Sequence, residues 1–73
     1  MANFKTLNKQ LKAKYPDLDI EVVRGDGYVY FDGEDGLGKI DSIYIHPPTI
    51  STEDLLMICI SSVESYLLEN LGN

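Results

Sequence analysis

The polarity of the chain alternates from residue to residue over much of the segment between positions 20 and 45. A period of two is typical of strands with one buried face, and three runs rich in Val, Ile, Tyr and Phe carry it. The apolar positions would share one face, and they are Val22, Val29, Phe31, Ile43 and Ile45. The opposite face would carry tyrosines beside carboxylates. The segment therefore predicts a three-stranded antiparallel meander.

Glycines separate the three runs. Gly25-Asp26-Gly27 lies between the first two, and a glycine there can adopt the positive φ that a tight hairpin requires. The connection over residues 33–39 is longer and contains three more glycines. We expect a hairpin followed by a longer loop.

Helical patterns flank the predicted strands. Apolar residues at spacings of three and four follow Asn3, a good N-cap, and Pro16 should end this first helix at Tyr15. The pair Pro47-Pro48 turns the chain off the sheet, and Ser51 is the expected N-cap of a second helix over about residues 52–70. Gly72 would follow its end.

The second helix has more apolar surface than one sheet can cover. We expect its inward stripe to contain Leu56, Cys59, Ile60, Val63 and Leu67. The run 55–60 is apolar nearly all round, so either the first helix or another subunit should cover the remaining flank. A two-fold dimer is the commonest way to bury such a surface. The residues expected to self-associate are Leu55, Met57, Ile58 and Leu68.

These elements predict an α+β fold in the order αβββα, with the apolar face of the sheet covered by helices. The 73 residues allow a single small domain over residues 1–73 with a modest core. A hydrophobic fraction of 44% favours a folded domain over a disordered chain.

Charge is distributed unevenly along the chain, whose net charge is −6. Residues 1–15 hold four lysines and no acid, whereas the remainder holds Arg24 and Lys39 against twelve acids, which leaves the two parts at +4 and −10. Such a chain lacks the broad basic field of a nucleic-acid binder and favours a basic protein partner. With one cysteine and neither a signal-like nor a membrane-spanning run, we expect a cytoplasmic protein without membrane contact.

No motif in the chain indicates catalysis, a metal or a cofactor. The acidic stretch 32–36 lacks the ligand spacing of a calcium loop, and its glycines fit neither phosphate-binding fingerprint. His46 has no nucleophile tied to it by a known motif, so we interpret it as a loop histidine. Cys59 lies between apolar residues and is expected to be a core residue. We therefore expect a non-enzymatic protein.

The polar face of the predicted sheet is the candidate binding surface. Its tyrosines could stack on bases, anchor a protein interface or simply face solvent; the acidic surroundings favour protein over nucleic acid. The residues expected to bind a partner are Tyr28, Tyr30, Tyr44, Asp32, Glu34, Asp35 and Asp41.

Three segments resemble a pattern found in small uncharacterised bacteriophage proteins, over roughly residues 18–57. The segments are Val23-Arg24-Gly25-Asp26-Gly27-Tyr28-Val29-Tyr30-Phe31, Asp41-Ser42-Ile43-Tyr44-Ile45 and Ile50-Ser51-Thr52-Glu53-Asp54-Leu55. They are similar to a glycine-bounded GxGYxYF strand, an SxYV strand and a helix opened by Leu-Ser/Thr. The resemblance implies a phage accessory protein in the bacterial host cytoplasm, where such proteins bind and disable host factors.

The leading hypothesis is therefore an acidic protein that binds and modulates or inhibits a host or phage protein. One alternative is a nucleic-acid mimic that blocks a DNA-binding or anti-phage defence enzyme, and another is a structural dimerisation module. A mimic should lose affinity steeply with salt, because screening acts beyond roughly 10 Å at 0.1 M salt, whereas a tyrosine-anchored interface should not.

Overall fold

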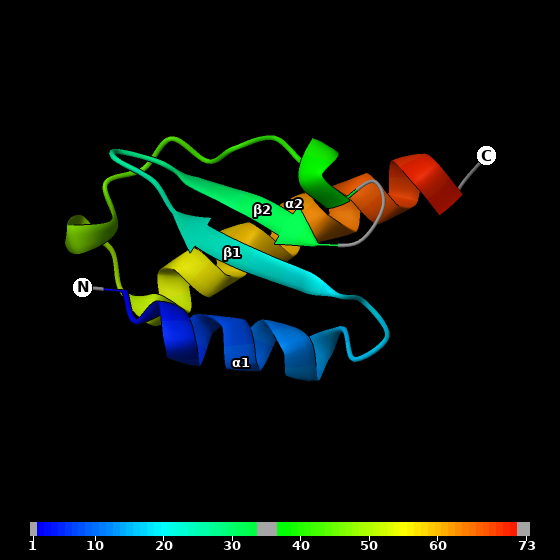
Figure 1. The fold of residues 1–73 in the computed structure, drawn as a ribbon, viewed down its shortest axis with the longest axis horizontal. Helices are drawn as coiled ribbons and strands as arrows, with labels where there is room; N and C mark the ends of the chain where they lie inside the picture. The colour runs from blue at the N-terminus through cyan, green and yellow to red at the C-terminus, as the bar shows by residue number, and fades with distance from the viewer. Residues whose placement is uncertain (1, 34–36, 72–73) are drawn as a thin grey trace.

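Two helices and one antiparallel hairpin make up the fold in a computed structural model, which describes residues 2–33 and 37–71 (Figure 1). The elements are α1 (Phe4–Lys14), β1 (Ile20–Arg24), β2 (Val29–Gly33) and α2 (Thr52–Leu71), with short 3-10 turns η1 (Leu37–Lys39) and η2 (Pro47–Thr49). α2 passes behind the hairpin, and α1 lies alongside β1 (Figure 1). The expected α+β class is confirmed.

Both helices begin at the predicted caps. The Asn3 side chain accepts a hydrogen bond from the Thr6 amide at 3.1 Å, and the Ser51 hydroxyl accepts one from the Asp54 amide at 3.1 Å. The Asn3 amide also donates to the Thr52 hydroxyl at 2.9 Å, which ties the two helix N-termini together. α1 ends at Lys14, as expected from the following proline; Gly72 lies outside the described residues.

The hairpin has the predicted tight turn. The Gly25 amide donates to the Tyr28 carbonyl at 2.8 Å, and Gly27 adopts a φ of +81°, a conformation that glycine tolerates best. The strands pair with Val22 opposite Phe31 and Val23 opposite Tyr30.

The prediction of a third strand is wrong. The described chain forms a two-stranded sheet, and the segment 42–45 contributes a single bridge, between Val29 and Ile43, whose backbone groups exchange two hydrogen bonds of 2.9 Å. The Ile45 amide then donates back to the Ile43 carbonyl at 3.1 Å, so the chain turns around Tyr44 instead of continuing extended.

The alternation also changes phase before Ile43. If the pairing continued from the bridge, Asp41 would lie opposite Phe31, on the apolar inner face, and Ile40 would point outward. In the structure Ile40 is buried and Asp41 is exposed. Burial of Ile40 therefore pulls the segment out of register with β2.

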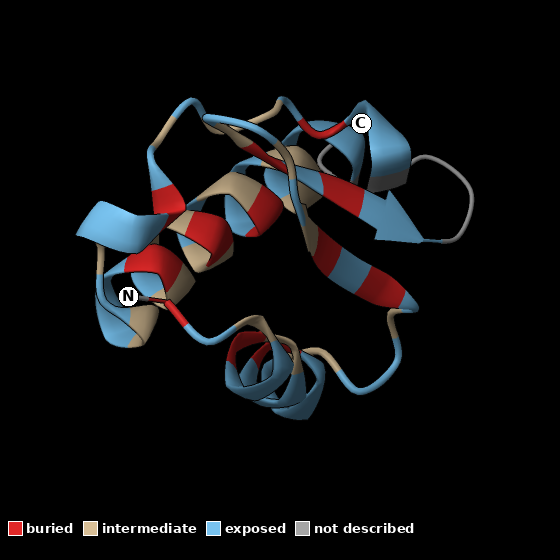
Figure 2. Ribbon diagram, turned by 60° about the vertical axis from the view of Figure 1, so that its left-hand side comes forward, coloured by how far each residue is buried: buried red, intermediate tan, exposed pale blue. Residues whose placement is uncertain are grey.

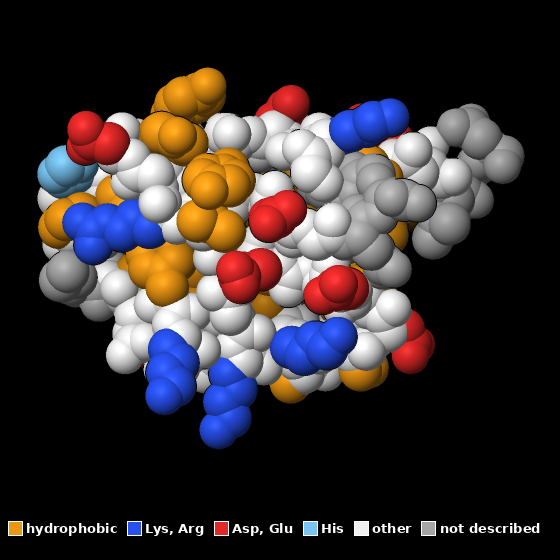
Figure 3. Space-filling model, viewed as in Figure 1, with side chains coloured by type: hydrophobic (Ala, Val, Ile, Leu, Met, Phe, Trp, Pro, Cys, Tyr) orange, Lys and Arg blue, Asp and Glu red, His pale blue; other side chains and the backbone are white. Residues whose placement is uncertain are grey.

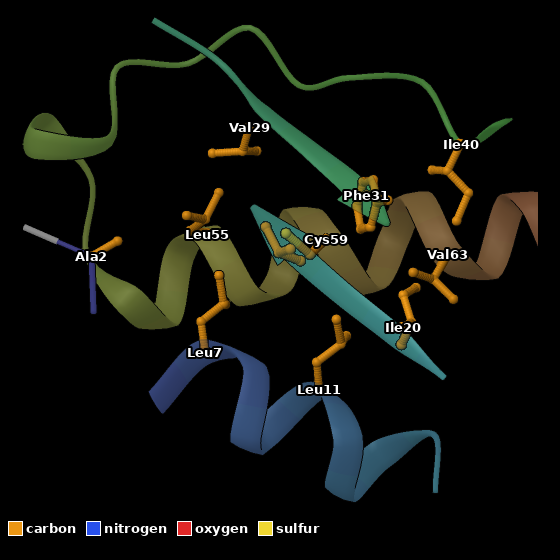
Figure 4. Close-up of a cluster of buried hydrophobic side chains, with 11 residues drawn as sticks. Ala2, Leu7, Leu11, Ile20, Val29, Phe31, Ile40, Leu55, Cys59 and Val63 are labelled. Carbon is orange, nitrogen blue, oxygen red and sulfur yellow. The ribbon is translucent and has the colours of Figure 1, made fainter. Parts of the chain in front are cut away.

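The core lies between the inner face of the hairpin and the two helices (Figures 2 and 4). Among the residues whose burial is described, the buried hydrophobic ones are Ala2, Leu7, Leu11, Ile20, Val22, Val29, Phe31, Ile40, Leu55, Cys59 and Val63. Ile43 and Ile45 pack against this cluster while remaining half-buried. The predicted apolar face is thus confirmed for β1 and β2.

A single side chain fastens α1 to the free edge of β1. The Asn8 carboxamide oxygen accepts from the Val22 amide at 2.7 Å, and its nitrogen donates to the Val22 and Phe4 carbonyls, both at 3.0 Å. Asn8 therefore satisfies both backbone groups of Val22 on the side away from β2, as a neighbouring strand would.

The inward stripe of α2 is rotated from the predicted one. Leu55, Cys59 and Val63 are fully buried, whereas Leu56, Ile60 and Leu67 are only half-buried. Leu7 of α1 lies beside Leu55 in the core (Figure 4). The second apolar flank of α2 was expected to be covered either by the first helix or by another subunit. At Leu55 the covering element is α1.

Candidate functional site

Three tyrosines gather on the outer face of the hairpin. The ring centroids of Tyr28 and Tyr30 lie 6.0 Å apart with planes tilted by 33°, and those of Tyr28 and Tyr44 lie 6.2 Å apart with a tilt of 42°. Tyr28 is half-buried between its neighbours, whereas Tyr30 is 37% and Tyr44 is 85% exposed. We call Tyr28, Tyr30 and Tyr44 the tyrosine cluster.

The register of the backbone assembles this cluster. Strand alternation points Tyr28 and Tyr30 away from the core. The bridge between Val29 and Ile43 places Tyr44 opposite Tyr28. The prediction that these tyrosines share one surface is thus correct, although one bridge rather than a strand brings Tyr44 to it.

Tyr28 rests directly on the backbone of Gly25. A Cβ atom at Gly25 would overlap the Tyr28 ring, so only glycine leaves room for the ring in this position. Gly25 therefore seats the central ring of the cluster, a role that the sequence pattern did not indicate.

Carboxylates lie next to the cluster on the same face. Asp32 follows Tyr30 by two residues and is paired across the hairpin with Glu21, and both side chains are exposed. Directly opposed like charges destabilise a strand pair slightly, so the hairpin keeps this acidic pair against its own stability. Asp41 is exposed in the segment that leads to Tyr44.

The structure treats the predicted acidic residues unequally. Asp32 is exposed on the outer face of the hairpin and Asp41 is exposed in the segment after η1, whereas Glu34 and Asp35 fall outside the described residues. Glu21 was not among the residues predicted to bind a partner. Because it alternates with the buried Val22, the sequence pattern could have placed it on the outer face.

Charged side chains surround the hydrophobic ones on this face. In the view of Figure 3, hydrophobic side chains gather over the hairpin with acidic side chains beside them, basic side chains project along α1, and further basic side chains lie at the left edge and at the upper right. Arg24, the one cation within the two strands, is exposed at the turn end of β1, opposite Val29. The acids Glu21 and Asp32 are paired toward the other end of the hairpin.

The residues predicted to self-associate divide into three groups. Leu55 is fully buried, so its place on an exposed flank is wrong: α1 covers it. Ile58 is half-buried. Met57 and Leu68 are 70% and 76% exposed and lie about three turns apart on one side of α2.

A polar hollow of about 350 Å³ lies between η1 and the C-terminal half of α2. Its lining residues are Lys39, Ile40, Asp41, Ser61, Ser62, Ser65, Tyr66 and Glu69. His46, the sole histidine of the chain, is not among them, so no imidazole is available there to activate a serine.

The thiol of Cys59 and the imidazole of His46 are placed as expected. Cys59 is buried, and desolvation raises the pKa of its thiol to about 12, which suppresses the nucleophilic thiolate. His46 is exposed at the start of η2. Across the described part of the chain, no cluster of three His, Cys, Asp or Glu side chains is arranged to hold a metal ion.

Within residues 2–33 and 37–71, no helix has both the length and the hydrophobicity needed to cross a membrane.

Comparison with known proteins adds no relative. No protein-family model, curated protein or solved structure matches this chain.

Proposed function

We propose that this chain is a non-enzymatic binding protein that docks on a larger protein through the tyrosine cluster and the adjoining acids. The observation that carries the proposal is the cluster itself, in which one half-buried ring supports two exposed ones. Tyrosine supplies a large contact area at low conformational cost, and buried tyrosines dominate the energetics of many interfaces.

Tyr44 contributes little to the stability of its own chain. Tyr44 is 85% exposed on a segment held by one bridge, so its ring buries little apolar area within the fold. A partner that covered Tyr44 and Tyr30 would bury that area.

The biological setting of the proposal follows the sequence resemblance. The partner would be a host or phage protein in the bacterial cytoplasm, and binding would modulate or inhibit it. Inhibition by occupancy requires no catalytic group, only a surface that competes with the partner's own ligand.

A nucleic-acid mimic is the second candidate. The like-charged pair of Glu21 and Asp32 favours it, because paired carboxylates on one face can imitate neighbouring phosphates. Its affinity would fall steeply between 50 and 300 mM salt, whereas tyrosine anchoring would persist.

Photo-crosslinking tests the proposal. A benzoylphenylalanine placed at Tyr44 should give a discrete adduct in a bacterial host lysate, and the same probe at the exposed Gln10 of α1 should not. Tyr30→Ala should reduce the adduct at position 44 and Tyr30→Phe should retain it. Identical adducts from positions 44 and 10, or none from position 44, would overturn the proposal.

We also propose that the chain self-associates through Met57 and Leu68, with Ile58 at the margin. These exposed apolar side chains lie on one side of α2, and a second copy would cover them. Leu68→Glu should yield a folded monomer. Sedimentation of the unmodified protein as an 8.2 kDa monomer at high micromolar concentration would refute self-association.

A further inference from the structure

We infer that the tyrosine cluster receives an arginine-bearing segment of its partner, an inference that rests on the proposed function. Two independent features of the outer face carry it. One is the set of exposed aromatic ring faces, and the other is the pair of exposed carboxylates, Glu21 and Asp32, beside Tyr30.

The ring geometry leaves aromatic faces open. Tilts of 33° and 42° at about 6 Å are neither stacked nor perpendicular, so the rings splay instead of covering one another. Tyr28 is held from below by Gly25, and Tyr44 is open to solvent over most of its surface. A flat cation can therefore lie over Tyr30 or Tyr44 within the roughly 6 Å that a cation–π contact requires.

The acids lie at a useful distance from those rings. Asp32 follows Tyr30 by two residues on the same face of β2, which is about 7 Å along a strand. Glu21 is opposite Asp32 on β1. A guanidinium stacked on Tyr30 can thus direct its N–H groups toward these carboxylates.

Arginine fits this arrangement better than lysine. Its guanidinium is planar and weakly hydrated, and its fixed donors match carboxylates while its face stacks on an aromatic ring. A lysine ammonium supplies the same charge, but it can neither stack on an aromatic ring nor form two parallel hydrogen bonds to a carboxylate. The site should consequently discriminate between two peptides of equal charge.

Peptide titrations followed by NMR provide the test. Three twelve-residue peptides of one design would carry arginine, lysine or citrulline at the same positions, the last retaining the planar shape without charge. We expect the arginine peptide to shift the amide signals of 28–32 and 44 and to bind at least threefold more tightly than the lysine peptide. The citrulline peptide should bind weakest.

Variants locate the contact. Tyr30→Leu should remove the preference for arginine over lysine, and Asp32→Asn should weaken both charged peptides, whereas Gln10→Ala on α1 should change neither. Equal binding of the arginine and lysine peptides, or shifts centred away from the tyrosine cluster, would overturn the inference.

A competition experiment separates this inference from the proposed function. The arginine peptide should suppress the crosslinked adduct formed from position 44. If the adduct forms and the peptide does not suppress it, the arginine inference is wrong and the binding function stands. If no adduct forms from position 44, the binding function itself is wrong.

Discussion

Asn8→Asp probes the contact that joins α1 to the hairpin. The carboxamide nitrogen of Asn8 donates to two carbonyl oxygens at 3.0 Å, and its oxygen accepts from the Val22 amide at 2.7 Å. An introduced carboxylate keeps the acceptor and the shape, but it replaces the donor by an oxygen facing two other oxygens. The substitution therefore removes two hydrogen bonds and adds a repulsion without creating a cavity.

The expected loss is large for a domain of this size. The Val22 carbonyl would be left without a donor, whereas the Phe4 carbonyl keeps its backbone bond within α1, so the loss should be about 1 to 3 kcal/mol of unfolding free energy. A chain of 73 residues is expected to have a total of roughly 4 to 11 kcal/mol. Asn8→Asp should consequently lower the urea midpoint by a sizeable fraction.

The loss should also depend on pH. The facing carbonyls disfavour the ionised form, so they raise the pKa of the introduced carboxyl in the folded state above its unfolded value. The variant then approaches the parent protein at low pH, where the protonated carboxyl can donate, and loses stability as pH rises through the folded pKa.

Urea unfolding followed by circular dichroism at pH 7 and about pH 4 measures both effects. Asn3→Asp is the matched control, because it makes the same charge change at an exposed N-cap, where Asp caps as well as Asn and favours the helix dipole. Equal stability of Asn8→Asp and the parent at pH 7 would refute the role assigned to Asn8. So would a difference in their unfolding free energies that is as large at pH 4 as at pH 7.

Local signals in the sequence located most of the fold. The caps at Asn3 and Ser51 depend only on their own helix starts, and the turn at Gly27 depends on one residue's freedom at positive φ. The two faces of β2 follow from alternation alone, which is why the outward direction of Tyr28 and Tyr30 was predictable.

Contacts between distant segments determine the features that local sequence patterns did not predict. The run 55–60 is apolar nearly all round, so its pattern does not say which side faces the core. Packing of Leu7 against Leu55 settles that choice. Apolar and polar residues do alternate over 42–45, in the predicted third strand. Burial of Ile40 nevertheless takes the preceding segment out of register with β2.

The candidate site shows the same division. Outward-facing tyrosines on β2 could be predicted from the alternation, but the approach of Tyr44 to Tyr28 depends on the bridge between Val29 and Ile43. The seat that Gly25 provides for Tyr28 depends on where a ring folds back, which no spacing rule specifies.

Three further substitutions or probes test the packing. Gly33→Ala should destabilise the fold by about 2 to 3 kcal/mol in urea unfolding, because a Cβ atom would overlap the Asp19 carbonyl oxygen. Gly38→Ala, where a Cβ atom meets open space, should change stability by less than about 0.5 kcal/mol, and equal effects of the two would contradict the steric reasoning. Cys59 should react with a thiol reagent only at the rate of unfolding, since burial raises its pKa to about 12; immediate labelling of the folded protein would show that the core is open there. The buried Tyr15 hydroxyl has no hydrogen-bond partner among the residues described, and desolvation, followed by the charge of Glu64, raises its pKa. Ionisation of Tyr15 therefore leaves the stability of the fold unchanged well below pH 10.0, the ordinary tyrosine pKa, and lowers it as pH rises through that value toward the higher folded pKa. Tyr15→Phe should be as stable as the parent or more so by about 1 kcal/mol at pH 8, and should lose less stability at pH 10.5. A variant less stable than the parent at pH 8, with the same alkaline loss, would show that the hydroxyl is satisfied and that its ionisation is not linked to folding.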